Sequence, residues 1–370
     1  MLLKISEHAL IHSDSSRVQA VISNELIKEL NGVQMLTIYL MKLKLDDGEY
    51  SDFELLYLDS LPADFKFHPL EWPQEYIDKV PNHTRKLIDD VRKRYENDLT
   101  VFKNAYDKYR RQFRYDYDDY YNVFKWSWLI VNTRSLYYPV KGKEDKVSQL
   151  SLCPYLDLIN HGSPTPNSQN LFTSLPKPYI PHEGGYELIN TTNNTIPSSK
   201  TVNFMYGAHN DAFLLSEYGF TLGCELNAFS SINITDEIYD MINISDKKLS
   251  LMETYNLNRD FNLDLYPSPC HPSINLIFLL KLLAIKDDDQ KGLRDWIKLI
   301  NFELDIINDE NEFKAKEVLM EICHKLKKKV LTNLNDDVVN KEPNIKKLYM
   351  NDSKVLNAII ENIENDIDIL

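Results

Sequence analysis

Two polar residues end an apolar run in a way that needs a chemical explanation. The stretch CPYLDLINHG at 153–162 carries Asp157 inside that run and stops at the pair Asn160 and His161. Buried amide and imidazole groups need hydrogen-bond partners, so a pair at the end of a buried strand indicates either local satisfaction or a bound ligand. A lone histidine in such a position is usually a satisfied structural residue, and spacing alone does not decide between the two.

A second stretch, NFMYGAHNDAFLLSEYGF at 203–220, contains two tyrosine-glycine pairs separated by a short helix-like segment. The pairs are Tyr206 with Gly207 and Tyr218 with Gly219. A glycine after tyrosine places a phenol beside a backbone position that can turn sharply or admit a close neighbour. Two such pairs suggest phenols that point into one cavity. The alternative is two turns with half-buried tyrosines, which the spacing by itself favours.

Spacing argues against several other kinds of site. His161, His209, Asp157 and Asp211 have side chains that bind metals, but no H-x-x-x-H or H-E-x-x-H motif joins them, so no metal is predicted. The chain has only 10 glycines and lacks both G-x-G-x-x-G and G-x-x-x-x-G-K-[ST], which excludes the standard Rossmann and P-loop sites. The nucleophile motif G-x-S-x-G is also absent.

Apolar periodicity identifies the elements that must position these stretches. The clearest amphipathic helix is predicted from about Thr84 to Phe113, because its apolar residues recur at alternating steps of three and four. Short strand-like pieces, YELIN at 186–190 and TVNFMYG at 201–207, lie near the candidate site. After a boundary near residues 245–250 the sequence becomes a series of helices joined by acidic turns.

Composition limits the compartment and the partners. The 370 residues are 43% hydrophobic and carry a net charge of −14, which argues against nonspecific nucleic-acid binding and is compatible with a basic protein partner or simply with solubility. Neither a signal peptide nor a membrane-spanning segment is recognisable, so we expect a cytoplasmic protein, with the nucleus as a second location. No C-x-x-C motif joins the cysteines, which indicates neither a zinc cluster nor a disulfide framework. They are Cys153, Cys224, Cys270 and Cys323.

Taken together, the two stretches resemble a known family. D-L-I-N-H at 157–161, followed after about forty residues by Y-G-x-x-N-x-x-L-L-x-x-Y-G-F at 206–220, is similar to SET-domain methyltransferases of the Rubisco large-subunit methyltransferase type. That group includes ribosomal-protein and elongation-factor lysine methyltransferases. Arg134 in NTRS fits the arginine that the family carries before its Asn-His strand. The resemblance covers roughly residues 1–225. Residues 250–370 resemble the substrate-binding domain that follows in this family, by their position and by their series of helices.

The resemblance implies an α+β fold in which short β-sheets surround a pseudoknot. The SET domain is expected at 1–60 and 120–245, with a helical insertion at 61–119. An all-helical, substrate-binding-like C-terminal domain is expected at 250–370.

The resemblance also implies a cofactor, S-adenosylmethionine. The side chain of Asn160 and the backbone of His161 would hold its methionine and adenine parts, and Arg134 and Tyr218 would complete the cofactor-binding set. Asp157 would pin the neighbouring backbone. No metal is implied.

The implied reaction is methyl transfer to a lysine side chain. Tyr206 would be the catalytic phenol near the reacting nitrogen, and Tyr218 and Phe220 would wall the substrate channel. The transfer needs positioning and a neutral amine more than a strong acid or base, and desolvation in an aromatic channel favours neutral lysine. The expected partner is a protein with a target lysine, such as a ribosomal protein or translation factor, and neither direct nucleic-acid nor membrane binding is expected.

One departure from the family pattern concerns the N-terminus. Members normally carry a glycine-rich G-x-G strand segment before an I-P-x-x-x-L-I-like segment, and LLKISEHALIH at 2–12 looks like the second of these. The sequence therefore predicts a truncated chain or an incomplete cofactor site. This departure supports an alternative, a catalytically weak SET-like interaction module. A further alternative is a protein-histidine methyltransferase, because one branch of the family methylates histidine. The Tyr-Gly-Phe triplet at 218–220 sits better with the lysine branch.

Overall fold

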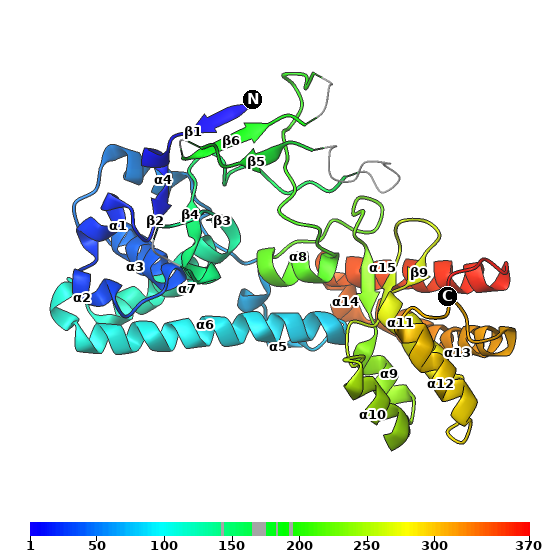
Figure 1. Cartoon of the computed structure of the whole chain (residues 1–370). Helices are drawn as coiled ribbons and strands as arrows, with labels where there is room; N and C mark the ends of the chain where they lie inside the picture. The colour runs from blue at the N-terminus through cyan, green and yellow to red at the C-terminus, as the bar shows by residue number, and fades with distance from the viewer. Residues whose placement is uncertain (142–143, 165–174, 183, 192–194) are drawn as a thin grey trace.

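The computed structural model describes residues 1–141, 144–164, 175–182, 184–191 and 195–370 (Figure 1). Within these ranges the chain is mainly helical and carries three small antiparallel sheets. The first sheet has the order β1-β6-β5, the second β2-β4-β3 and the third β7-β8-β9. The strands are β1 (Leu3–Ile5), β2 (Ile11–His12), β3 (Leu136–Tyr137), β4 (Leu150–Leu152), β5 (Lys177–Tyr179), β6 (Tyr186–Ile189), β7 (Ser231–Asn233), β8 (Asn262–Asp264) and β9 (His271–Pro272).

The first two sheets join segments that are far apart in the sequence. Leu3 pairs with Leu188 across β1 and β6, and Ile11 pairs with Leu152 across β2 and β4. Apolar side chains of the first sheet form a small core that includes Leu188 and also Phe204, whereas Ile11 and Leu152 of the second sheet belong to a larger core formed with helices. The small core lies directly under the candidate site, because Tyr206 packs against it.

Helices fill the chain between β2 and β3. They are α1 (Ser16–Val21), α2 (Asn24–Ile27), α3 (Gly32–Lys44), α4 (Asp52–Ser60), α5 (Gln74–Ile77), α6 (Asn82–Lys108) and α7 (Tyr117–Arg134). The sequence of α3, GVQMLTIYLMKLK, is apolar on nearly every side, and this helix is buried almost throughout its length. Helical structure thus begins well before residue 61, and the expected limits of the insertion stay a prediction.

The long helix α6 starts close to the predicted position and ends earlier than predicted. It stops at Lys108, where Tyr109 leaves helical geometry (φ −115°, ψ 33°) and a short 3₁₀ turn follows. Its apolar face contacts two different cores. Ile88 packs in the core formed mainly by residues after 215, called the C-terminal core. Val91 and Phe102 pack in the core formed with α3 and α7, called the N-terminal core. Figure 1 shows α6 extending from one half of the molecule to the other.

The C-terminal part is helical, as predicted, but two short strands interrupt it. Its helices, after α8 (Asp211–Tyr218), are α9 (Thr235–Met241), α10 (Asp246–Thr254), α11 (Ile274–Leu283), α12 (Gln290–Ile300), α13 (Asp309–Leu334), α14 (Asp337–Lys341) and α15 (Pro343–Glu364). Strands β8 and β9 continue the sheet that β7 begins, so this region is not purely helical. No helix in the described ranges combines the length and the apolarity needed to cross a membrane.

Candidate active site

A backbone crossing brings the two stretches identified from the sequence into contact. His161 and Phe204 form an isolated parallel bridge. The Gly162 amide donates a hydrogen bond to the Phe204 carbonyl at 3.0 Å, and the Phe204 amide donates to the Asn160 carbonyl at 3.2 Å. The end of the apolar run therefore lies beside the segment that leads into Tyr206.

Aromatic rings gather immediately after this crossing. The Tyr206 ring centroid lies 5.1 Å from that of His161 and 5.2 Å from that of Tyr218. Phe220 lies 5.9 Å from His161 and 6.2 Å from Tyr218. Such separations are within the range of favourable aromatic contacts. The four side chains form one cluster, which supports the interpretation of phenols sharing a site over that of two unrelated turns.

His161 positions the backbone of Tyr206. Its Nδ1 accepts a hydrogen bond from the Tyr206 amide at 3.1 Å, which assigns the proton of the neutral ring to Nε2. Burial, followed by repulsion from His209, lowers the pKa of His161 to about 4. The ring is therefore neutral at physiological pH, and its Nε2 is buried with no hydrogen-bond partner among the described residues.

A cavity of about 120 Å³ opens beside the Tyr206 ring. Its lining is Thr133, Arg134, Ser135, Leu136, Tyr137, Asp157, Ile159, Phe204, Tyr206 and Tyr218. Pockets that enclose whole drug-sized ligands usually span roughly 300–1,000 Å³. This cavity therefore has the size of a side chain or part of a larger ligand. The Tyr206 hydroxyl donates to the Ile159 carbonyl at 2.8 Å, which fixes the phenol at the cavity wall.

Arg134 and Asp157 meet at this wall in an arrangement that differs from the expected one. Arg134 is the last residue of α7, and its Nη1 donates to the backbone carbonyl of Asp157 at 2.8 Å. The Asp157 carboxylate instead accepts a hydrogen bond from the hydroxyl of Tyr57 on α4. The run before Asn160 is not a strand, since β4 ends at Leu152 and turns follow. The arginine fixes the backbone of this turn segment, the role that the resemblance implied for the aspartate. Arg134 Nε and Asp157 Oδ1 find no partner in the described part of the chain.

The remaining candidate, Asn160, lies outside the cavity. It is exposed, it is not part of the cavity lining, and no described residue hydrogen-bonds with its side-chain amide. Arg134, Tyr206 and Tyr218 thus line the cavity, and His161 and Phe220 contact the tyrosines from its edge. The geometry places the site residues together except for the side chain of Asn160, and their individual roles stay predictions.

Comparison with known proteins shows which proteins this chain resembles. Residues 242–359 match the family described as Rubisco LSMT substrate-binding. The chain is 28% identical over 342 residues to SET domain-containing protein 4 of Artemia parthenogenetica, covering 90% of this chain and 78% of that protein. It is 24% identical over 356 residues to ribosomal lysine N-methyltransferase 2 of Saccharomyces cerevisiae, covering 88% and 72%.

A solved structure of Rubisco LSMT bound to sinefungin and monomethyllysine superposes over 100% of this chain and 83% of that one, with a TM-score of 0.59 and 14% identity. The chain has the SET-domain fold of that structure. The family recognised from the two sequence stretches is thereby confirmed, as is the predicted fold class.

Two residues at the site of this SET-domain protein were not identified from its sequence. Tyr57 lies 100 positions before its partner Asp157, and no local pattern connects them. Phe204 lines the cavity and packs on Tyr206 with ring centroids 5.2 Å apart. Phe204 and Tyr206 are two positions apart, and the alternation of an extended segment places such residues on one side, so this signal was present.

The buried Asp157 predicts a pH dependence of the stability of the SET-domain protein. Burial raises its pKa from 3.8 to about 6, although the Tyr57 hydroxyl opposes the shift. Between these values the unfolded chain has lost the proton that the folded chain retains, so this group makes the protein less stable as pH rises from about 4 to 6. Relative to wild type, Asp157→Asn should gain about 2 to 3 kcal/mol of unfolding free energy across that window. Urea unfolding at several pH values measures this, and parallel pH profiles of the two proteins would contradict it.

Gly219 fixes the end of α8 and with it the position of Tyr218. The helix begins at Asn210, whose side chain accepts from the Phe213 amide, and ends at Gly219 in the left-handed region, with φ +82°. A Cβ at Gly219 would lie 2.7 Å from the ring of Phe67 and 3.0 Å from the backbone of His68. Gly219→Ala should therefore lower the unfolding free energy by about 2 to 4 kcal/mol, through backbone strain and overlap together.

A second glycine separates those two causes. Gly223 has φ +88°, but a Cβ there would meet nothing within 4 Å. Gly223→Ala should therefore cost only the backbone strain, about 1 kcal/mol. Urea unfolding of both variants gives the comparison, and equal losses would mean that contact with Phe67 does not limit the residue at position 219.

Proposed function

We propose that this protein transfers a methyl group from S-adenosylmethionine to the side-chain amine of a lysine in a ribosomal protein or translation factor. The observation that carries the proposal is the cavity of side-chain size beside the Tyr206 phenol, walled by Tyr218, next to the backbone crossing that carries Asn160 and His161. The ribosomal target is supported by the relatives, since two of them are ribosomal lysine methyltransferases.

The residues at the crossing fit the cofactor of this fold. S-adenosylmethionine is the methyl donor of the SET fold, and it supplies an electrophilic methyl group when bound. Arg134 Nε and His161 Nε2 are buried polar atoms without partners among the described residues, and Asn160, which directly precedes His161, is exposed. A polar ligand at the outer side of the crossing would satisfy these groups, as buried polar atoms require. Arg134, Asn160 and the His161 backbone are therefore assigned to hold it.

The cavity residues prepare the lysine for reaction. Apolar and aromatic walls remove water from the amine, which disfavours the ammonium form and leaves the nitrogen lone pair available. Burial raises the pKa of Tyr206, and it raises that of Tyr218 to about 12, so both phenols keep their protons at neutral pH. With its proton donated to the Ile159 carbonyl, the Tyr206 oxygen can accept an N–H from the amine and orient it. The aromatic faces also tolerate the cationic product.

The test is transfer of radiolabelled methyl groups into ribosomal proteins isolated from cells that lack this protein. We expect the full chain with labelled S-adenosylmethionine to label a discrete band, and mass spectrometry to place the methyl group on lysine. A band labelled on histidine would replace the lysine assignment. Absence of both labelling and S-adenosylmethionine binding would reject the enzyme and favour an interaction module.

A further inference from the structure

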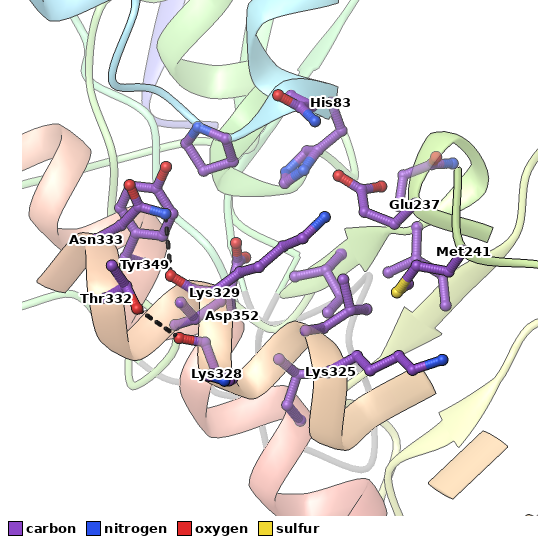
Figure 2. A pocket seen from close by; sticks show the side chains of 18 residues that line it. His83, Glu237, Met241, Lys325, Lys328, Lys329, Thr332, Asn333, Tyr349 and Asp352 are labelled. Carbon is purple, nitrogen blue, oxygen red and sulfur yellow. Dashed lines mark hydrogen bonds between the residues drawn. The ribbon is translucent and has the colours of Figure 1, made fainter. Parts of the chain in front are cut away.

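A second and larger cavity, of about 580 Å³, lies in the C-terminal half (Figure 2). It is bounded by the first turn of α6, by β7 and α9, and by the helices α13 and α15. None of its lining residues belongs to the cavity beside Tyr206. Its rim includes the exposed residues Asn82, Lys325 and Thr332, so the space is open to solvent.

Two carboxyl groups line this cavity, and neither forms an ion pair with a described residue. Asp352 on α15 is only 6% exposed, and no hydrogen bond or ion pair joins it to any residue that the structure describes. Glu237 on α9 has a buried Oε2 that lacks a partner in the same described set. Burial first, and then repulsion by Glu237, raises the pKa of Asp352, and burial raises that of Glu237. Buried charges of one sign are costly unless a cation or donor pairs with them.

The basic residues of the cavity do not supply that cation. Lys325 pairs with Glu321 on its own helix, outside the cavity lining. Figure 2 shows the Lys329 side chain extending toward Glu237. Burial raises the pKa of Glu237 and outweighs the attraction to Lys329, which lowers it, and the two residues form no ion pair. Burial lowers the pKa of His83 to about 4, so this ring is neutral. The carboxyl groups therefore face an opening large enough for a side chain from outside.

The rest of the lining suits a side chain with an aliphatic stem. Ile232, Leu326 and Leu356 are buried apolar residues that line the cavity together with the carboxyl groups. Arginine and lysine combine such a stem with a cationic head, and a carboxylate–guanidinium pair is among the stronger hydrogen-bonded contacts in proteins. The exposed residues Lys325, Lys328 and Lys329 add positive charge at the mouth of the cavity. This charge favours a ligand that carries an acidic group next to its basic side chain.

We propose that this cavity binds an arginine or lysine side chain of a partner protein, with the charged head at Glu237 and Asp352 and the stem along the apolar wall. The partner is the methylation substrate, so the proposal rests on the proposed function and adds a second recognition point to it. The residue of the substrate that enters this cavity is therefore an arginine or lysine other than the lysine that is methylated.

The first experiment measures binding of short capped peptides to the full chain by NMR-detected titration without S-adenosylmethionine. Acetyl-Glu-Arg-Glu-amide should bind saturably with a dissociation constant on the order of 1 mM, as a ligand of this size allows. The same peptide with neutral citrulline in place of arginine should bind at least tenfold more weakly. Equal binding of the two would overturn the proposal, and tighter binding of free spermidine would assign the cavity to a small amine instead.

Variants then locate the binding. Glu237→Gln and Asp352→Asn should each weaken the arginine peptide at least tenfold, whereas Asp240→Asn, exposed on the same helix and outside the cavity, should not. Asp352→Asn keeps the shape and replaces a buried carboxyl group that pairs with no described residue, so its melting temperature should equal or exceed that of wild type. Unchanged affinity in both cavity variants would overturn the proposal. If the chain methylates protein but does not bind the peptides, this binding site is rejected and the proposed function stands. If it binds the peptides but transfers no methyl group, only the proposed function is rejected.

Discussion

Tyr206→Phe is expected to lower the rate of methyl transfer by about 100-fold or more and to leave S-adenosylmethionine affinity nearly unchanged. The Tyr206 hydroxyl donates to the Ile159 carbonyl and thereby directs its lone pairs, so its loss affects the orientation of the amine in the transition state more than ground-state binding. The phenylalanine ring preserves the contacts with His161 and Tyr218. Single-turnover kinetics and calorimetric titration of the cofactor measure the two effects separately.

The control is Tyr179→Phe, which removes a phenol from an exposed position on β5, outside the cavity. It should leave both rate and affinity unchanged. Removing the hydroxyl of Tyr206 also deletes one hydrogen bond, which costs only about 1 kcal/mol of stability. A Tyr206→Phe protein with a much lower melting temperature and an unaltered rate would show that the phenol has only a structural role.

Asn160→Ala should have the opposite pattern, weakening S-adenosylmethionine binding first. Without the amide, a polar group of the cofactor would be buried with no hydrogen-bond partner. The binding free energy would then be weaker by roughly 1–3 kcal/mol, equivalent to about a 5- to 150-fold loss of affinity. Stability should be unaffected, because the side chain is exposed and no described residue hydrogen-bonds with it. Its backbone carbonyl, which accepts from Phe204, is retained.

Asn243→Ala provides the matched control, since Asn243 is also exposed and lies far from the crossing in the sequence. Calorimetric titration of the cofactor and thermal unfolding on all three proteins are sufficient. If Asn160→Ala lowers the melting temperature and retains full cofactor affinity, the amide belongs to the fold and not to the cofactor site.

Local patterns in the sequence identified the elements that a single apolar period defines. The helix α6 was predicted within a few residues of each end, and the strand β6 coincides with the YELIN piece. The predicted helix between the two tyrosine-glycine pairs is α8. The glycines that follow Tyr206 and Tyr218 drew attention to them, but spacing alone favoured two unrelated turns, and only the family resemblance assigned both tyrosines to one site, where their rings lie 5.2 Å apart.

Contacts between distant segments could not be derived in this way. Nothing near Asp157 in the sequence indicates that its carboxylate accepts from Tyr57, because each lies in a segment with its own local pattern. In the sequence, Asp352 and Glu237 look like ordinary polar positions of helices. Asp352 is a buried acid because α15 packs against β7, a contact that no local pattern indicates. The strands β8 and β9 are too short for an alternating pattern to stand out within helical surroundings.

The helix α6 also determines how the molecule can lose its structure. At 27 residues it is about 40 Å long, and its apolar face is shared between the C-terminal core at Ile88 and the N-terminal core at Val91 and Phe102. Melting either core would strip one end of α6 of its packing, and a solvated helix of that length gains little from propensity alone. Because both cores stabilise the same helix, loss of one core should destabilise the other, and we expect the two halves to unfold as one cooperative unit.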